Sequence, residues 1–182
     1  MKRLALLLAF GLAACSNAAG TPYERGVAAF NRGDVRTARV EFMNVLQADP
    51  DNRAARIMQA RVQLALADGV AAESEIMRAR QTGVPIEATG HLLAHARLLQ
   101  NDPQGALREA ASVPSEHAAY AARIRGRAFM ALGDSASALA EFNQALALAP
   151  DDSTVWSDVA RFRPTNGDVA GAMEARDGRL AA

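Results

Sequence analysis

The sequence predicts an all-α protein made of repeated helical hairpins. Half of its 182 residues are apolar but only 5% are aromatic, and alanine alone accounts for 42 of them. A core of Ala and Leu with few large rings suits close packing of helix against helix, whereas β-sandwiches and barrels favour β-branched and aromatic residues. A short loop that places Gly, Ala or Asn beside Asp also recurs along the chain, which indicates a repeat array.

The charge balance and the single cysteine exclude several classes of site. The chain carries 20 basic and 20 acidic residues, so no overall field would draw it to nucleic acid. One cysteine rules out an intrachain disulfide, a Cys-based zinc site and a CxxC redox pair. The phosphate-binding GxxxxGK-S/T loop, the dinucleotide-binding GxGxxG motif and the GxSxG nucleophile motif are missing from the sequence. We therefore expect no catalytic activity and no cofactor.

The first fourteen residues predict a secretory signal peptide. Lys2 and Arg3 give a positive start, and residues 4–14 form an uncharged apolar run that is too short to span a bilayer as a helix. The run ends in the sequence LAAC at 12–15, which resembles the lipobox of bacterial lipoproteins. The alternative is an ordinary secretory signal with an incidental cysteine.

The lipoprotein resemblance implies that cleavage occurs before Cys15 and that its thiol is acylated. The family carries several acyl chains, which give stable anchoring where a single chain does not, and membrane contact is expected through this anchor alone. Ser16 stands where an aspartate commonly retains such proteins in the inner membrane, so we expect the periplasmic face of the outer membrane. Residues 15–21 are small and polar and predict a flexible tether, with the repeat domain over 22–182.

Helical-hairpin units of about 34 residues follow the tether. The loop spacings are 34, 34, 32 and 34 residues, measured from Gly33, Ala67, Asn101, Gly133 and Gly167. This period, with a helix-length segment on each side of every loop, resembles the tetratricopeptide repeat (TPR). The units are expected at about 19–52, 53–86, 87–118, 119–152 and 153–182. The resemblance implies a right-handed superhelix of about five hairpins, with a concave groove lined by the first helix of each unit.

Small residues at matched positions explain how the two helices of a unit come close. They are Gly26, Ala60, Ala94, Gly126 and Ala160 on the first helices, and Ala38, Ala72, Ala106, Ala138 and Ala172 on the second. Larger side chains there would push the backbones apart. Phe42, Ile76 and Phe142 are expected to fill the remaining gaps.

The ends of the helices are predicted by acidic residues and prolines. Asp34, Asp102, Asp134 and Asp168 follow the loops and are expected to cap second helices, while 49–52 and 149–152 stop one helix and cap the next. Pro103 suits a first helical position. The third unit is two residues short, and Pro114 is expected to end its second helix early. In the fifth unit, Pro164 falls near the end of the first helix.

The TPR resemblance implies which side chains face the groove. Carried onto this chain, the positions are Tyr23, Phe30, Ile57, Arg61, Leu64, His91, His95, Leu98, Tyr120, Arg123, Arg127, Met130 and Arg161. Arginines and histidines are present among these positions, and carboxylates are not. We expect an acidic, partly apolar protein or peptide ligand, because the planar guanidinium binds a carboxylate with two hydrogen bonds. The alternative is that the arginines pair with acidic residues on second helices or stay solvated.

His91 and His95 form a second, weaker candidate site. Histidines at i and i+4 share one face of a helix and are able to bind one metal ion. The zinc-protease motif needs Glu directly after the first His, and Leu92 stands there instead. His117 is placed on the loop that enters the fourth unit, so a third ligand is not evident. We expect groove-lining histidines and no metal, with metal binding as a remote alternative.

Three envelope systems contain lipoproteins of this kind. The stretches 75–83, 92–107 and 125–133 are most similar to repeat lipoproteins that accompany exosortase-type sorting and exopolysaccharide export. Those relatives are usually far longer, so the chain resembles only an N-terminal portion of them, either as a shortened relative or through generic repeat similarity. The alternatives are a pilus-biogenesis lipoprotein that helps a secretin ring to assemble and an accessory subunit of the outer-membrane protein assembly machinery. The oligomeric state stays open.

Overall fold

The computed structural model describes residues 20–165, and this part of the chain contains nine α-helices, one 3-10 turn and no strand. The all-α prediction is confirmed for this range. The expected signal peptide, the lipidation site at Cys15 and the cap at Asp168 lie outside the described residues. Within the described range, no helix is long and apolar enough to cross a bilayer.

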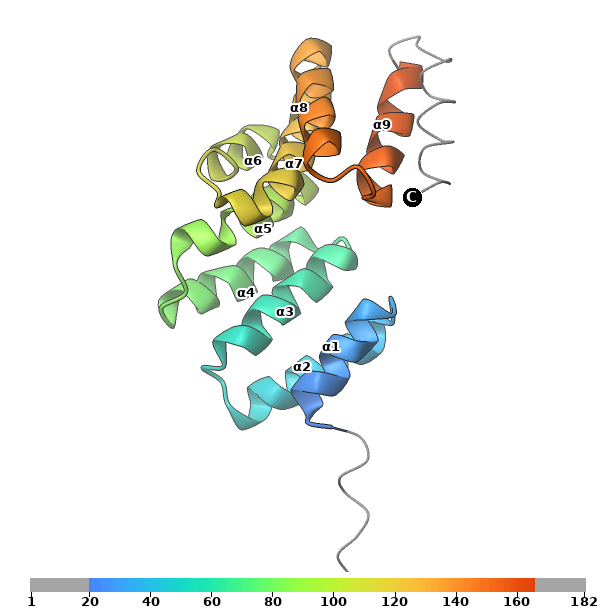
Figure 1. The fold of residues 1–182 in the computed structure, drawn as a ribbon. Helices are drawn as coiled ribbons and strands as arrows, with labels where there is room; N and C mark the ends of the chain where they lie inside the picture. Colours follow the sequence, from blue (N-terminus) through green and yellow to red (C-terminus); the bar gives the residue numbers. More distant parts are fainter. Residues whose placement is uncertain (1–19, 166–182) are drawn as a thin grey trace, which may run out of the picture.

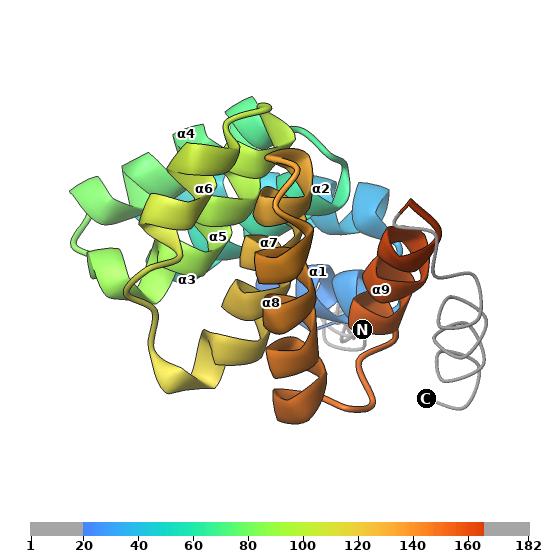
Figure 2. The same cartoon turned by 90° about the horizontal axis from the view of Figure 1, so that it is seen from above.

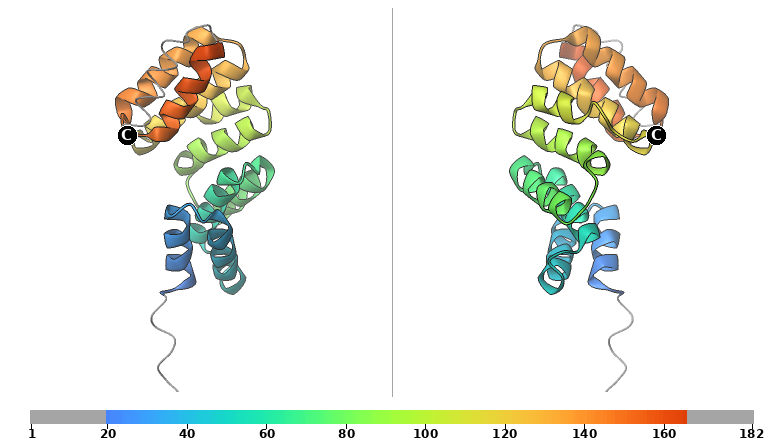
Figure 3. Two further views of the ribbon diagram at one scale, coloured as in Figure 1. Left: turned by 90° about the vertical axis from the view of Figure 1, so that its right-hand side faces the viewer. Right: turned by 90° about the vertical axis from the view of Figure 1, so that its left-hand side faces the viewer.

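Eight of the helices form four consecutive antiparallel hairpins. Their bounds are α1 (Pro22–Asn31), α2 (Val35–Ala48), α3 (Arg53–Ala65), α4 (Gly69–Gln81), α5 (Ile86–Leu99), α6 (Pro103–Glu109), α7 (Ala118–Ala131) and α8 (Ser135–Leu148), and α9 (Ser153–Thr165) follows them. The hairpins stack side by side from the α1/α2 end to the α9 end (Figure 3). The array curves so that α1 and α9 lie toward the same side, away from α4 and α6 (Figures 1 and 2).

The loops inside the hairpins begin where the sequence predicts. Gly33, Ala67, Asn101 and Gly133 all have positive φ, between 59° and 79°. One residue in the left-handed region turns the chain out of the first helix, so that the next backbone N–H bonds back to a free carbonyl. The amide of Asp34 donates in this way to the carbonyl of Ala29 at 2.9 Å. The regular loop spacing therefore reflects one repeated helix ending.

Aspartates cap the second helices as predicted. Asp34, Asp102 and Asp134 each accept a hydrogen bond from the backbone N–H three residues later, which satisfies one of the free donors at a helix start. Asp68 does the same for α4, and Pro103 is the first residue of α6.

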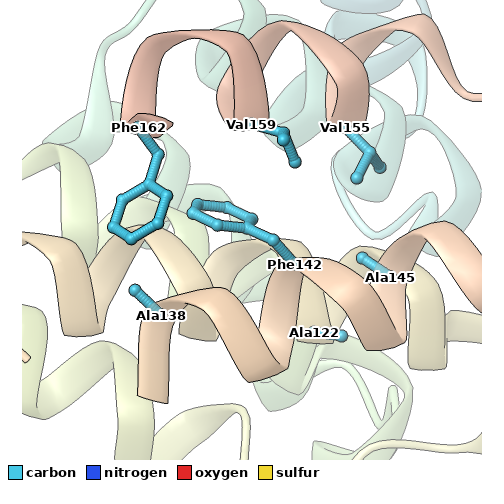
Figure 4. Close-up of a cluster of buried hydrophobic side chains, with 7 residues drawn as sticks. All are labelled: Ala122, Ala138, Phe142, Ala145, Val155, Val159 and Phe162. Atoms are coloured by element: carbon cyan, nitrogen blue, oxygen red, sulfur yellow. The ribbon is translucent and has the colours of Figure 1, made fainter. Parts of the chain in front are cut away.

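In the first and fourth hairpins, a glycine on one helix lets a phenylalanine ring of the other helix pack directly against its backbone. A Cβ added to Gly26 would lie 2.8 Å from the Phe42 ring, and one added to Gly126 would lie 2.7 Å from the Phe142 ring. Both rings are fully buried. Phe142 also packs against Phe162 of α9, with 5.5 Å between ring centroids, so it joins the hairpin to the next helix (Figure 4).

The third hairpin is shorter than the sequence predicts. Helix α6 ends at Glu109, well before Pro114, so the proline is not what stops it. The Arg125 guanidinium donates to the carbonyl of Ala110 at 3.1 Å and satisfies this early helix end. The chain then enters a 3-10 turn, η1 (Ser115–His117), before α7 begins.

Candidate ligand groove on the concave face

A groove of about 660 Å³ lies on the concave side of the array. Its walls come from α1, α3, α5, η1 and α7, and the loop before α9 closes one end. Eight of the side chains that the sequence places in the groove line it: Phe30, Ile57, Arg61, Leu64, His91, His95, Tyr120 and Arg123. They lie together because each unit repeats the same helix orientation, so matched positions face one way.

The five other predicted groove residues, Arg127 among them, do not line it. Tyr23 packs edge-on against the Phe42 ring, with 5.7 Å between centroids. Leu98 and Met130 pack against buried clusters between the helices. Arg161 is exposed on α9 and does not line the groove.

Arg61 is the cation at the α1/α3 end of the groove. Its guanidinium carbon lies 5.7 Å from the centroid of the Phe30 ring, within cation–π range. Its nearest polar contact is the sulfur of Met58, at 3.9 Å. Among residues 20–162, no carboxylate lies within ion-pair distance of Arg61. Its donors are therefore free to bind an anion from outside.

Arg123 and Arg127 are placed differently, at the α7/α9 end. The Asp158 carboxylate of α9 is 8% exposed and lies 3.2 Å from Nη1 of Arg123 and 4.0 Å from Nε of Arg127. Arg123 also covers the Tyr120 ring at 5.1 Å. Burial lowers the pKa of Arg127, while the charge of Asp158 raises it.

Carboxylates in and beside the groove were missed by the sequence analysis. Glu116 and Asp152 line the groove, and Asp158 pairs with Arg123 from the next unit. Arginines outside the groove do pair with second helices, since Arg25 forms an ion pair with Glu41 and Arg125 forms one with Glu141, each at 2.8 Å. Asp158 lies on a first helix instead, but not at a position that the repeat pattern assigns to the groove, so only the packing of α9 on α7 reveals it.

Four aromatic side chains, His91, His95, His117 and Tyr120, line the groove. Nδ1 of His95 and the hydroxyl of Tyr120 are 2.6 Å apart and share a hydrogen bond. The ring of His91 stacks on that of His117, with centroids 3.7 Å apart, and meets Tyr120 edge-on. His91 is 7% exposed, and its Nδ1 has no hydrogen-bond partner among the described residues.

His91 and His95 are neutral at physiological pH. Burial and the charges of His117 and Arg61 lower the pKa of His91 to about 4. Burial, Arg127 and Arg123 lower the pKa of His95 to about 3. Burial raises the pKa of Tyr120, so its hydroxyl keeps its proton.

The histidines do not assemble a metal centre in the described range, where no group of three His, Cys, Asp or Glu side chains converges. The structure does bring His117 to His91, which the sequence analysis did not expect, but as a stacked ring. The groove therefore offers an unpaired guanidinium, hydrogen-bonding rings and apolar walls. This combination suits the binding of a ligand that is partly anionic and partly apolar.

Comparison with known proteins identifies the fold. Residues 118–162 match the sequence profile of a tetratricopeptide repeat. TTC0263, a TPR protein of Thermus thermophilus, has a similar structure, with a TM-score of 0.70 and 21% identity over 88% of this chain and 89% of that chain. PilW, described as a widely conserved type IV pilus biogenesis factor, gives 0.70 and 16% identity over 92% and 80% of the two chains.

YrrB, described as a TPR protein with an unusual peptide-binding site, is a further similar structure. Its TM-score is 0.51 at 15% identity, over 91% of this chain and 87% of that chain. A search of curated protein sequences finds no significant match. The repeat profile and these structures agree with the observed hairpins, and the chain therefore has the fold of a tetratricopeptide-repeat superhelix.

Proposed function

We propose that the protein is a non-catalytic interaction scaffold whose concave groove binds an acidic, partly apolar segment of a partner protein. The observation that carries the proposal is Arg61, an exposed guanidinium in the groove without a carboxylate partner among the described residues. Phe30 and Ile57, which line the groove and are only half-buried, supply apolar surface for a neighbouring side chain. The likeness to YrrB, whose description includes a peptide-binding site, supports a peptide as the ligand.

The charge of Arg61 provides the direct test. We expect Arg61→Glu to abolish the retention of acidic peptides from a random peptide library displayed on phage, because it places a carboxylate where the ligand's anion would bind. Arg39→Glu is the matched control, since Arg39 is an exposed arginine of α2 that does not line the groove. Equal enrichment of acidic peptides by the native protein and by Arg61→Glu would contradict the proposal.

We also propose that Cys15 carries the lipid that tethers the scaffold to the periplasmic face of the outer membrane. The support is the LAAC sequence at 12–15 behind a short apolar run, together with Ser16. Labelling cells with an alkyne-bearing fatty acid is expected to tag the native protein and not a Cys15→Ser variant. A labelled Cys15→Ser protein would contradict lipidation at this residue.

Envelope polysaccharide export or surface-protein sorting is the pathway that we propose, on the sequence resemblance in the second to fourth units. Pilus biogenesis is the second candidate, favoured by the likeness to PilW. Deleting the gene separates the two, since loss of surface polysaccharide supports the first and loss of twitching motility with intact polysaccharide supports the second. A defect in outer-membrane protein insertion would instead support the third candidate, an assembly accessory subunit.

A further inference from the structure

The two ends of the groove differ in how many of their charges are already neutralised. At the α1/α3 end, Arg61 has no carboxylate partner within residues 20–162. At the α7/α9 end, Asp158 lies between Arg123 and Arg127 at 3.2 and 4.0 Å. One end is thus an open anion site, and the other is an anion site that the chain fills itself.

The geometry of Asp158 is that of a bound ligand carboxylate. It is 8% exposed, and its Oδ2 faces guanidinium groups that stand one helical turn apart on α7. Such groups bind carboxylates with charge-assisted hydrogen bonds. A ligand anion arriving here would have to displace Asp158, which is held in place by the packing of Val155 and Val159 beside it on α9.

A further carboxylate reinforces this difference. Asp152, in the loop directly before α9, lines the groove. Asp152 is fixed by hydrogen bonds from the backbone and hydroxyl of Thr154, at 2.8 and 2.6 Å. A second acidic group of a ligand would meet the carboxylates of Asp152 and Asp158 here, and like charges disfavour each other at short range.

We infer that Asp158 determines the specificity of the groove: it restricts the ligand to one carboxylate, bound at Arg61, and leaves the α7/α9 end for neutral or apolar residues. This inference rests on the proposed function and adds the charge pattern and the direction of the ligand. The apolar part of the ligand then crosses Tyr120 and His95, which lie between the two ends.

The test is a selection from one random dodecapeptide library displayed on phage, carried out with the native protein and with Asp158→Asn. We expect the native protein to enrich peptides with a single acidic residue. Asp158→Asn frees both arginines, so it is expected to enrich peptides with two acidic residues and to bind them about tenfold more tightly than the native protein does. The arginine-deficient variant Asp158→Asn/Arg123→Gln/Arg127→Gln is expected to return to single-acid peptides.

The arginine-deficient variant is the control for a loosened α9, because it lacks the same ion pairs but offers no second anion site. Trp156, the only tryptophan, lies on α9, so its fluorescence reports whether α9 stays docked in each variant. If the native protein and Asp158→Asn enrich acidic peptides with the same number of acidic residues, the role of Asp158 is overturned and the proposed function stands. Failure of the native protein to enrich acidic peptides at all would overturn both.

Discussion

The α5/α6 and α7/α8 hairpins are neighbours in the stack, but their two helices pack against each other in different ways. In α7/α8, the Phe142 ring fills the space opposite Gly126, and each helix has 14 residues. The matching positions in α5/α6 are Ala94 and Ala110, both buried and both small. Helix α6 has only seven residues, and the chain after it folds back so that Val113 covers the alanines.

The two hairpins therefore contribute differently: one mainly stabilises the array, and the other mainly shapes the groove. The regular hairpin uses its second helix to present a large buried ring that also holds α9 (Figure 4). The short hairpin leaves room for η1, which carries His117 onto His91 and Glu116 into the groove. An irregular unit therefore shapes the groove, while the regular unit beside it holds the array together.

The largest expected effect is at the ring of the regular hairpin. We expect Phe142→Ala to lower the free energy of unfolding by about 3–5 kcal/mol, because it leaves a cavity between α7, α8 and α9. Urea denaturation followed by circular dichroism and by Trp156 fluorescence measures the loss. Leu148→Ala is the control on the same helix, since Leu148 is 51% exposed and should change stability by less than about 0.5 kcal/mol. Similar losses for the two variants would remove the distinction between the hairpins.

The second expected effect comes from giving the short hairpin the packing of the regular one. Ala110→Phe is expected to cost about 1–3 kcal/mol, because the ring has no space opposite Ala94. Ala94→Gly alone should also destabilise, by about 1 kcal/mol, through its low helix propensity. The double variant Ala94→Gly/Ala110→Phe should nevertheless be more stable than Ala110→Phe, since it recreates the Gly126–Phe142 pair. Strictly additive losses in this cycle would show that the backbone around α6 forbids such packing.

The third expected effect is a pH dependence of the free energy of unfolding, which arises from two histidines of the short hairpin. In the folded protein the pKa values of His91 and His95 are about 4 and 3, below the usual 6.5. The unfolded chain therefore takes up protons first, so stability is full above about pH 6.5 and falls as the pH drops toward 4. Each histidine contributes a slope of at most about 1.4 kcal/mol per pH unit.

Replacing His91 tests the origin of this slope. Phenylalanine keeps a ring against His117 and removes the titrating group, so His91→Phe should flatten the decline of stability between about pH 6.5 and 4. Leu148→Ala should leave the slope of the native protein unchanged. A native slope retained in His91→Phe would mean that other groups produce it.

The regular hairpin could be predicted from the sequence because its contacts join residues that are close together along the chain. Gly126 and Phe142 are 16 residues apart in one hairpin, and the loop at Gly133 fixes their register. The capping aspartates act over three residues. Helix periodicity and turn chemistry determine such contacts, so the loops, the caps and most groove-lining positions follow from the pattern.

The charge distribution of the groove could not be predicted in the same way. Asp158 and Arg123 are 35 residues apart, and their contact depends on how α9 rotates against α7. His117 reaches His91 only because α6 ends before Pro114, at a point marked by no breaking residue. These features arise from packing between units, which the repeat pattern does not encode.

The smallest expected effect concerns the loop inside each of the two hairpins. Gly133 and Asn101 both have positive φ, at 79° and 60°. A side chain at Gly133 would meet no atom within 4 Å, so any cost of Gly133→Ala is conformational and should be about 1 kcal/mol. Asparagine tolerates the left-handed region, so Asn101→Gly should change stability by less than about 0.5 kcal/mol. Urea denaturation of both variants resolves these values, and a larger effect at Asn101 would mean that its side chain, and not its backbone, supports the short hairpin.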